Sequence, residues 1–223
     1  MIPQFACQVK DDCVRVNFYT PLVSNLLLPG KKEVVLKLNT DYPVTDKIEI
    51  EVIPVKESEF TLALRIPAWS GNTTVAVNGA PEAGILQGAY FPLTRKWKKG
   101  DKITLQLDLR ARVLEKNEAQ AIVRGPLVLA RDSRFNDGFV DEASVIVSKD
   151  GYVELTPVAA PAFAWMAFTA PVVLGTDLEG NGASRQVHFC DFASAGNTWD
   201  KSQRYRVWLP KTLNVMHSPY KPY

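Results

Sequence analysis

The aromatic side chains of this sequence point to one kind of chemistry, the stacking of flat rings on sugars. An aromatic face suits the C–H face of a pyranose or furanose, and Trp97 stands next to a turn, where a loop platform could lie. Trp97, Tyr90 and Trp199 are therefore the candidate carbohydrate-binding residues. The simpler alternative is that the aromatic rings fill and edge a protein core. The candidates come from a wider set of Trp69, Trp97, Trp165, Trp199, Trp208 and Tyr90.

Two short groupings carry side chains that can bind metals. His188 and Cys190 are two residues apart and share a face if their segment is a strand; no further ligand follows except the adjacent Asp191. The alternating oxygens of Asp177, Glu179 and Asn181 could bind calcium, but no acidic residue stands where an EF-hand loop ends. An ordinary strand with a buried thiol and a solvated turn explain these residues more simply, so we predict no metal site.

No catalytic arrangement can be recognised in the sequence. Glycoside hydrolysis needs two carboxyl groups on opposite sides of one bond, whereas pairs such as Asp11–Asp12 and Asp141–Glu142 resemble exposed turns and strand edges. A Ser–His–Asp triad would have to use His188 or His217, and neither lies near a nucleophile-elbow motif. We assign no catalytic residue on this basis.

The composition is that of an ordinary globular protein. The chain has 223 residues, 46% of them hydrophobic and 22% charged, with a net charge of +2. Scattered Lys and Arg form no basic stripe, which argues against a nucleic-acid partner. The longest apolar run, residues 158–174, is broken by Pro161 and Pro171, which argues against a membrane span. Three cysteines, Cys7, Cys13 and Cys190, are too few for a disulfide framework.

The N-terminal residues lack the basic and apolar regions of a signal peptide. The expected compartment is therefore the cytoplasm. It would be the periplasm or the exterior if the chain is a piece of a longer protein with its own signal.

The elements that would position these side chains are β-strands. In FTLALRIPAW at 60–69, apolar and other residues alternate with the period of a half-buried strand, which Pro67 closes. Similar strands separated by turns recur about every ten residues, which predicts an all-β fold, an antiparallel jelly-roll-like β-sandwich. Residues 111–121 could contain a helical turn. We predict a leading segment at 1–30, a sandwich at 31–130, and a second β-rich part at 131–223 that packs on or extends it.

Five motifs in a fixed order resemble one known family. TDYP at 40–43, FTLALRIPAW at 60–69, VNG at 77–79, WKKGD at 97–101 and RGPLV at 124–128 resemble the C-terminal β-sandwich region of glycoside hydrolase family 127. These are β-L-arabinofuranosidase-like proteins, formerly a domain of unknown function. The segment at 7–22 looks like the one that leaves the catalytic barrel of that family, and RYRVWLP at 204–210 looks like a late strand.

The resemblance implies that catalysis belongs to an (α/α)6 barrel that this chain lacks. In the family a cysteine nucleophile near a zinc ion and a glutamate acid/base carry out retaining hydrolysis of β-L-arabinofuranosides on that barrel. The nucleophile lies in a Cys-Cys pair, which this sequence does not contain. We therefore carry over no catalytic or zinc residue, and we expect zinc only in the barrel and no cofactor in this chain.

Three hypotheses for function follow from these observations. The first is a non-catalytic β-sandwich portion of an arabinofuranosidase-like hydrolase, whose partner is the barrel or a second copy of the chain. Its apolar stretch at 21–30 would be exposed without a partner. The second is a free-standing carbohydrate-binding module for arabinose-containing polysaccharide. The third is a small enzyme that uses Glu115 or Asp191.

Overall fold

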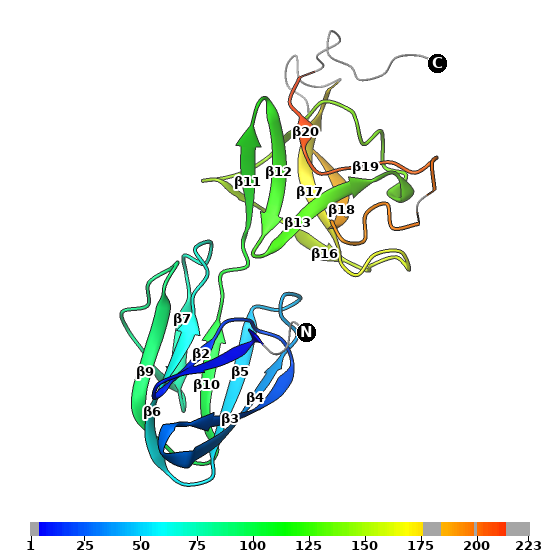
Figure 1. Ribbon diagram of the computed structural model, residues 1–223. Coiled ribbons are helices and arrows are strands. Elements are labelled where there is room, and N and C mark those ends of the chain that lie inside the picture. Colours follow the sequence, from blue (N-terminus) through cyan, green and yellow to red (C-terminus); the bar gives the residue numbers. More distant parts are fainter. Residues whose placement is uncertain (1–4, 176–183, 199, 213–223) are drawn as a thin grey trace. The chain divides into compact units, whose positions relative to one another are not determined.

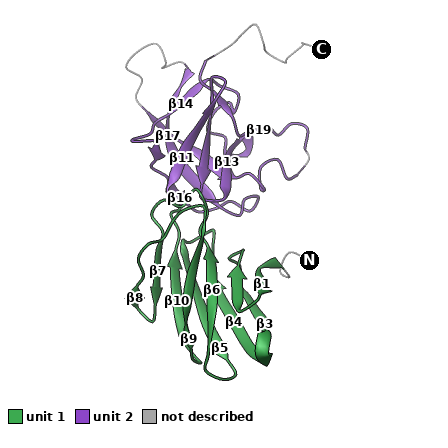
Figure 2. Ribbon diagram, turned by 60° about the vertical axis from the view of Figure 1, so that its left-hand side comes forward, with its two compact units in different colours: residues 1–109 green, residues 110–223 purple. Residues whose placement is uncertain are grey.

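A computed structural model describes residues 5–175, 184–198 and 200–212 of the chain (Figure 1). The chain divides into two compact units, residues 1–109 and residues 110–223 (Figure 2). The described residues form β-strands, with short 3₁₀ turns at Pro29–Lys31 (η2) and Ser133–Phe135 (η3) and no α-helix. This confirms the predicted all-β, sandwich-like fold class.

Unit 1 is built from two sheets. In the four-stranded sheet β2 and β6 run parallel, while the neighbouring pairs are antiparallel. Its strand order is β1 (Cys7–Lys10), β2 (Cys13–Val16), β6 (Ser58–Arg65) and β9 (Tyr90–Trp97). The order in the six-stranded sheet is β3 (Leu22–Leu28), β4 (Lys32–Thr40), β5 (Lys47–Pro54), β10 (Asp101–Gln106), β7 (Thr74–Val77) and β8 (Ala80–Pro81).

The core of unit 1 lies between these two sheets. Ile48, Ile50 and Val52 of β5 alternate with more exposed residues and are buried together with Leu62 and Leu64 of β6. Burying one such side chain stabilises the fold by roughly 1.5–3 kcal/mol. The period-two pattern of the sequence therefore identifies the residues that hold the sandwich together.

Unit 2 has its own core and a longer series of paired strands. The order is β14 (Ser144–Ile146), β17 (Ala167–Leu174), β18 (Arg185–Asp191), β13 (Leu127–Asp132), β12 (Ala119–Arg124), β11 (Ala111–Lys116) and β15 (Tyr152–Val153). Three short strands pair alongside: β16 (Thr156–Val158) with β17, β19 (Tyr205–Arg206) with β13, and β20 (Leu209–Pro210) with β12.

The helical turn that the sequence suggested at 111–121 is wrong. This segment is an antiparallel hairpin in which Lys116 of β11 lies opposite Ala119 of β12. The two residues between them, Asn117 and Glu118, have φ values of 49° and 57°. Two successive left-handed residues form the tight turn that matches the twist of paired strands, and this local geometry prevents a helix.

The boundary between the units also differs from the sequence-based boundary near residue 130. It falls between Leu109 and Arg110 because β13 pairs with β12 and β18, all of which belong to unit 2. The residues that we expected to form a leading segment at 1–30 contribute β1, β2 and β3 to the two sheets of unit 1. They are therefore part of this sandwich.

Candidate functional site

Trp97, the first candidate for sugar stacking, is a core residue. Its side chain is 0% exposed, and its ring lies 6.0 Å from the ring of Phe60. The indole N–H donates a hydrogen bond of 3.0 Å to the carbonyl oxygen of Phe60. A buried ring with a satisfied N–H has no face to offer a sugar. Trp97 therefore fills the core, which is the simpler of the two explanations given for the aromatic residues.

Tyr90 lies at the other end of the same strand from Trp97. Its side chain is exposed, but the guanidinium of Arg15 lies 5.5 Å from the ring centroid, and the hydroxyl donates to Asn17. Seven residues along a strand span roughly 23 Å, so the structure does not bring Tyr90 and Trp97 together. Trp199, the third candidate, lies outside the described residues.

The His188 and Cys190 pair is part of strand β18. The ring Nδ1 of His188 lies 3.2 Å from Asp137 Oδ2, and the ring stacks on Phe135 with centroids 5.0 Å apart. Burial raises the pKa of the Cys190 thiol to about 12, so this thiol stays protonated at neutral pH and is a poor metal ligand. The calcium candidates at 177–181 lie outside the described residues. No group of three His, Cys, Asp or Glu suited to a metal occurs in the part of the chain that the structure describes.

The carboxylates named for a small enzyme both serve local structure. Asp191 is buried, and its oxygens accept hydrogen bonds from the backbone N–H groups of Met166 and Ser194 and from the Ser194 hydroxyl. Glu115 is exposed and accepts from the side chains of Gln120 and Lys211. Each group is occupied in fixing a loop or a strand end.

Unit 2 contains a groove that the sequence analysis did not identify. Three aromatic side chains line it and stay exposed: Phe192 by 49%, Tyr205 by 47% and Trp208 by 41%. Its volume of about 700 Å³ falls in the range of small-ligand sites. We call it the aromatic groove, and its lining residues are Val128, Phe192, Tyr205, Arg206, Val207 and Trp208.

Strand β13 brings the parts of the aromatic groove together from distant positions in the sequence. β13 pairs with the end of β18, after which the backbone N–H of Phe192 donates to the carbonyl oxygen of Val128 at 2.9 Å. Farther along β13, Asp132 lies opposite Tyr205 of β19. The chain then crosses through Trp208 to β20, which pairs with β12. Exposed rings from two segments, which pair with opposite edges of β13, thus converge on one groove.

The ring of Tyr205 rests against a glycine. A Cβ atom on Gly196 would lie 2.5 Å from two ring carbons of Tyr205, and the Gly196 φ of +62° is in the left-handed region. A residue without a side chain is therefore needed at this position. The ring of Phe192 lies on the same groove, with its centroid 6.0 Å from that of Tyr205.

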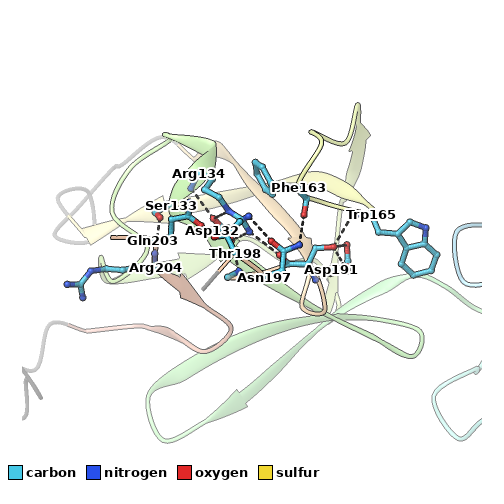
Figure 3. A network of polar contacts seen from close by, with 12 residues as sticks. Asp132, Ser133, Arg134, Phe163, Trp165, Asp191, Asn197, Thr198, Gln203 and Arg204 are labelled. Carbon is cyan, nitrogen blue, oxygen red and sulfur yellow. Dashed lines mark hydrogen bonds and ion pairs between the residues drawn. The ribbon is translucent and has the colours of Figure 1, made fainter. Parts of the chain in front are cut away.

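An ion pair with a buried carboxylate, Asp132, fixes the loop that carries Gly196 (Figure 3). The guanidinium of Arg134 donates to both oxygens of Asp132, from Nε at 2.8 Å and from Nη2 at 2.6 Å. Arg134 also donates to the carbonyl oxygen of Ser194 and to Asn197 Oδ1, and the N–H of Gly196 donates to Asp132 Oδ2. These bonds tie residues 194–197 to the end of β13.

The electrostatics of this pair favour its charged form. Burial alone would raise the pKa of the Asp132 carboxyl, but the hydrogen bonds from Arg134 and Gly196 and the Arg134 charge outweigh it. The pKa of Asp132 therefore lies below its ordinary value. The same hydrogen bond from Arg134 to Asp132 raises the pKa of Arg134. Both groups remain ionised at neutral pH.

Arg206 is the charged residue among those that line the aromatic groove. Its Nε donates to Asp141 Oδ1 at 2.5 Å, and this carboxylate also lies 4.0 Å from Arg204 Nη1. The positive charge of Arg206 is thus matched by a neighbouring negative charge. The groove combines aromatic faces with polar edges, and its charged lining residue, Arg206, is held in an ion pair.

Comparison with known proteins identifies the kind of domain that unit 1 is. Residues 13–109, which run from β2 to the end of unit 1, match the family model described as the β-L-arabinofuranosidase GH127 middle domain. Residues 13–109 are related to family GH127. The match supports a glycoside hydrolase-associated domain in this part of the chain. The matching model describes a middle domain, so the C-terminal assignment from the sequence motifs is not confirmed.

A curated relative is also a β-L-arabinofuranosidase. The non-reducing end β-L-arabinofuranosidase of Bifidobacterium longum subsp. longum is 32% identical over 90 residues, which are 37% of this chain and 14% of that enzyme. The alignment thus spans a small part of the relative's length.

Solved structures share the fold over most of the chain. A GH127 β-L-arabinofuranosidase from Geobacillus stearothermophilus T6 has a TM-score of 0.78 and 19% identity, over 94% of this chain and 35% of that one. The GH127 β-arabinofuranosidase BT3674 has a TM-score of 0.75 and 22% identity, over 94% of this chain and 36% of that one. This chain therefore corresponds to little more than a third of those proteins.

The described residues contain no helix with the length and apolar character of a membrane span.

Proposed function

We propose that this chain is the non-catalytic β-sandwich portion of an arabinofuranosidase-like glycoside hydrolase. It would have an accessory role in the breakdown of plant polysaccharides, next to a catalytic (α/α)6 barrel. The observation that carries the proposal is the match of residues 13–109 to the GH127 middle domain. The chain spans 35–37% of the solved glycoside hydrolases that share its fold, which leaves room for a separate catalytic domain in such proteins.

An exposed apolar surface on unit 1 supports an accessory role. On the outer side of β3, Val23 is 63% exposed and Leu27 is 65% exposed, and Val55 lies beyond the end of β5. In the strand register Val35 lies between Asn25 and Ile53, whereas Lys37 lies opposite Val23 and Glu33 lies opposite Leu27. Apolar side chains of three strands thus share this face with charged ones. We call Val23, Leu27, Val35, Ile53 and Val55 the outer apolar face.

A surface of this kind is typical of a covered interface. The occupant that we propose is the catalytic barrel. The apolar stretch at 21–30 contains the edge strand β3. Successive side chains of β3 alternate between the two faces of the sheet, so every second one is exposed.

The outer apolar face can be tested with paired variants. We expect the purified chain to bind a hydrophobic dye such as ANS, and the double variant Val23→Ser with Leu27→Ser to bind much less with little change in melting temperature. The matched control is Leu86→Ser, because Leu86 is 70% exposed but lies outside this face. Equal dye binding by all three proteins would contradict a covered interface at β3.

A second candidate function, carbohydrate binding, is favoured by the aromatic groove of unit 2. It corresponds to the free-standing binding module among the hypotheses from the sequence. The residues differ from those named there, because Trp97 is buried and the exposed rings gather around β19.

A further inference from the structure

We propose that the aromatic groove of unit 2 binds a neutral saccharide, with sugar rings stacked on Tyr205 and Trp208. The inference deepens the second candidate function and rests on it for the choice of plant polysaccharides as ligands. It does not depend on whether unit 1 packs on a barrel. Its basis is the convergence of exposed aromatic faces, their rigid support and the ion pair that already engages Arg206.

The first argument is the set of exposed rings. Aromatic side chains usually bury most of their surface, so three half-exposed rings in one groove are unusual for a folded core and typical of a ligand site. Two of these rings have polar ends. Neither the Tyr205 hydroxyl nor the Trp208 indole N–H has a hydrogen-bond partner among the described residues, so both can bond to sugar hydroxyl groups.

The second argument is rigidity. The Tyr205 ring lies directly on the backbone of Gly196, and Gly196 is tied to the buried Asp132 carboxylate. The backbone of Ser133 also donates to the carbonyl oxygen of Arg204 at 2.9 Å, which fixes the chain just before Tyr205. A preformed platform loses little conformational entropy when a ligand binds, which is a property of binding sites.

The third argument is charge. Arg206 already pairs with Asp141, a carboxylate that it shares with Arg204, so an anion in the groove would have to compete with that carboxylate for the Arg206 guanidinium. A neutral polysaccharide fits this lining better than an acidic one does. The same argument disfavours a phosphorylated or strongly acidic partner.

The test is affinity electrophoresis in gels that contain arabinan, arabinoxylan or hydroxyethyl cellulose, with polygalacturonate as the acidic probe. We expect at least one neutral polysaccharide to retard the full chain and polygalacturonate to leave its migration unchanged. Trp208→Ala and Tyr205→Ala should weaken retardation by about tenfold or more. The matched control is Trp165→Ala, because Trp165 is 55% exposed in the same unit but does not line the groove.

Circular dichroism and melting temperature establish that each variant is folded. Equal retardation of all variants, or retardation by polygalacturonate alone, would overturn the proposal. So would the absence of retardation by every neutral polysaccharide, although the outer apolar face and its dye-binding test would be unaffected. If Trp208→Ala instead converts a dimer into a monomer in sedimentation experiments, the groove is an interface between copies and the sugar proposal is wrong.

Discussion

Single residues decide between the two explanations that the sequence allowed for its tryptophans. Trp97 is enclosed by the sandwich of unit 1 and hydrogen-bonded to Phe60, whereas Trp208 is partly exposed in the aromatic groove. The sequence alone could not separate these cases, because both residues follow alternating stretches next to a turn. The two tryptophans differ in the strands around them. Trp97 belongs to β9, which pairs with β6 in the sandwich, whereas Trp208 lies between β19, which pairs with β13, and β20, which pairs with β12.

Replacement of Trp97 therefore tests the core assignment. We expect Trp97→Ala to lower the free energy of unfolding of unit 1 by about 3–5 kcal/mol, because it leaves a large cavity and removes a buried hydrogen bond. Urea denaturation monitored by circular dichroism measures this effect. Trp165→Ala, at an exposed position, should change stability by less than about 1 kcal/mol. A stable Trp97→Ala variant that has lost polysaccharide binding would instead restore Trp97 as a sugar platform.

At the scale of elements, strands were predictable wherever one face is buried. The inward residues of the segments at 34–40 and 47–55 recur with period two, and these segments correspond to β4 (Lys32–Thr40) and β5 (Lys47–Pro54). RYRVWLP at 204–210 also alternates, yet it forms two short strands with different partners. Alternation reports which residues face a core, but it carries no information about pairing order. The aromatic groove was missed for this reason, since its residues come from three separate segments.

The ion pair between Asp132 and Arg134 connects two elements, and its energetics predict a pH dependence. The pKa of Asp132 is lowered in the folded state from an unfolded value near 3.8. The pair therefore stabilises unit 2 fully above about pH 4, and this contribution is lost as the pH falls through the lower folded pKa.

The variant Asp132→Asn should leave the partly exposed Arg134 without its counter-charge and cost about 1.5–3 kcal/mol of unfolding free energy at neutral pH. Urea denaturation between pH 7 and pH 2.5 measures both effects, and the variant should lose less stability on acidification than the unmodified chain. Asp150→Asn is the control, because Asp150 is exposed in a turn whose left-handed φ of 53° Asn also adopts. If Asp132→Asn loses as much unfolding free energy on acidification as the unmodified chain does, other carboxylates dominate the pH dependence and the prediction is wrong.

For the whole molecule, two features of separate units bear on function. Unit 1 carries the GH127 middle-domain match and the outer apolar face, and unit 2 carries the aromatic groove. Order and spacing of five short motifs were enough to indicate the GH127 relationship from the sequence. They did not indicate the middle domain that the family model describes, because a short alternating motif carries no information about its position in a longer chain.

The central claim is that this chain works beside a catalytic domain and is not itself the hydrolase. The most direct measurement is immunoprecipitation with antibodies to this chain from cells that carry its gene, followed by an assay with 4-nitrophenyl β-L-arabinofuranoside. We expect hydrolysis by the precipitate and none by the purified 223-residue chain. Hydrolysis by the purified chain, or a precipitate that contains the chain but has no hydrolase activity, would contradict the proposed function.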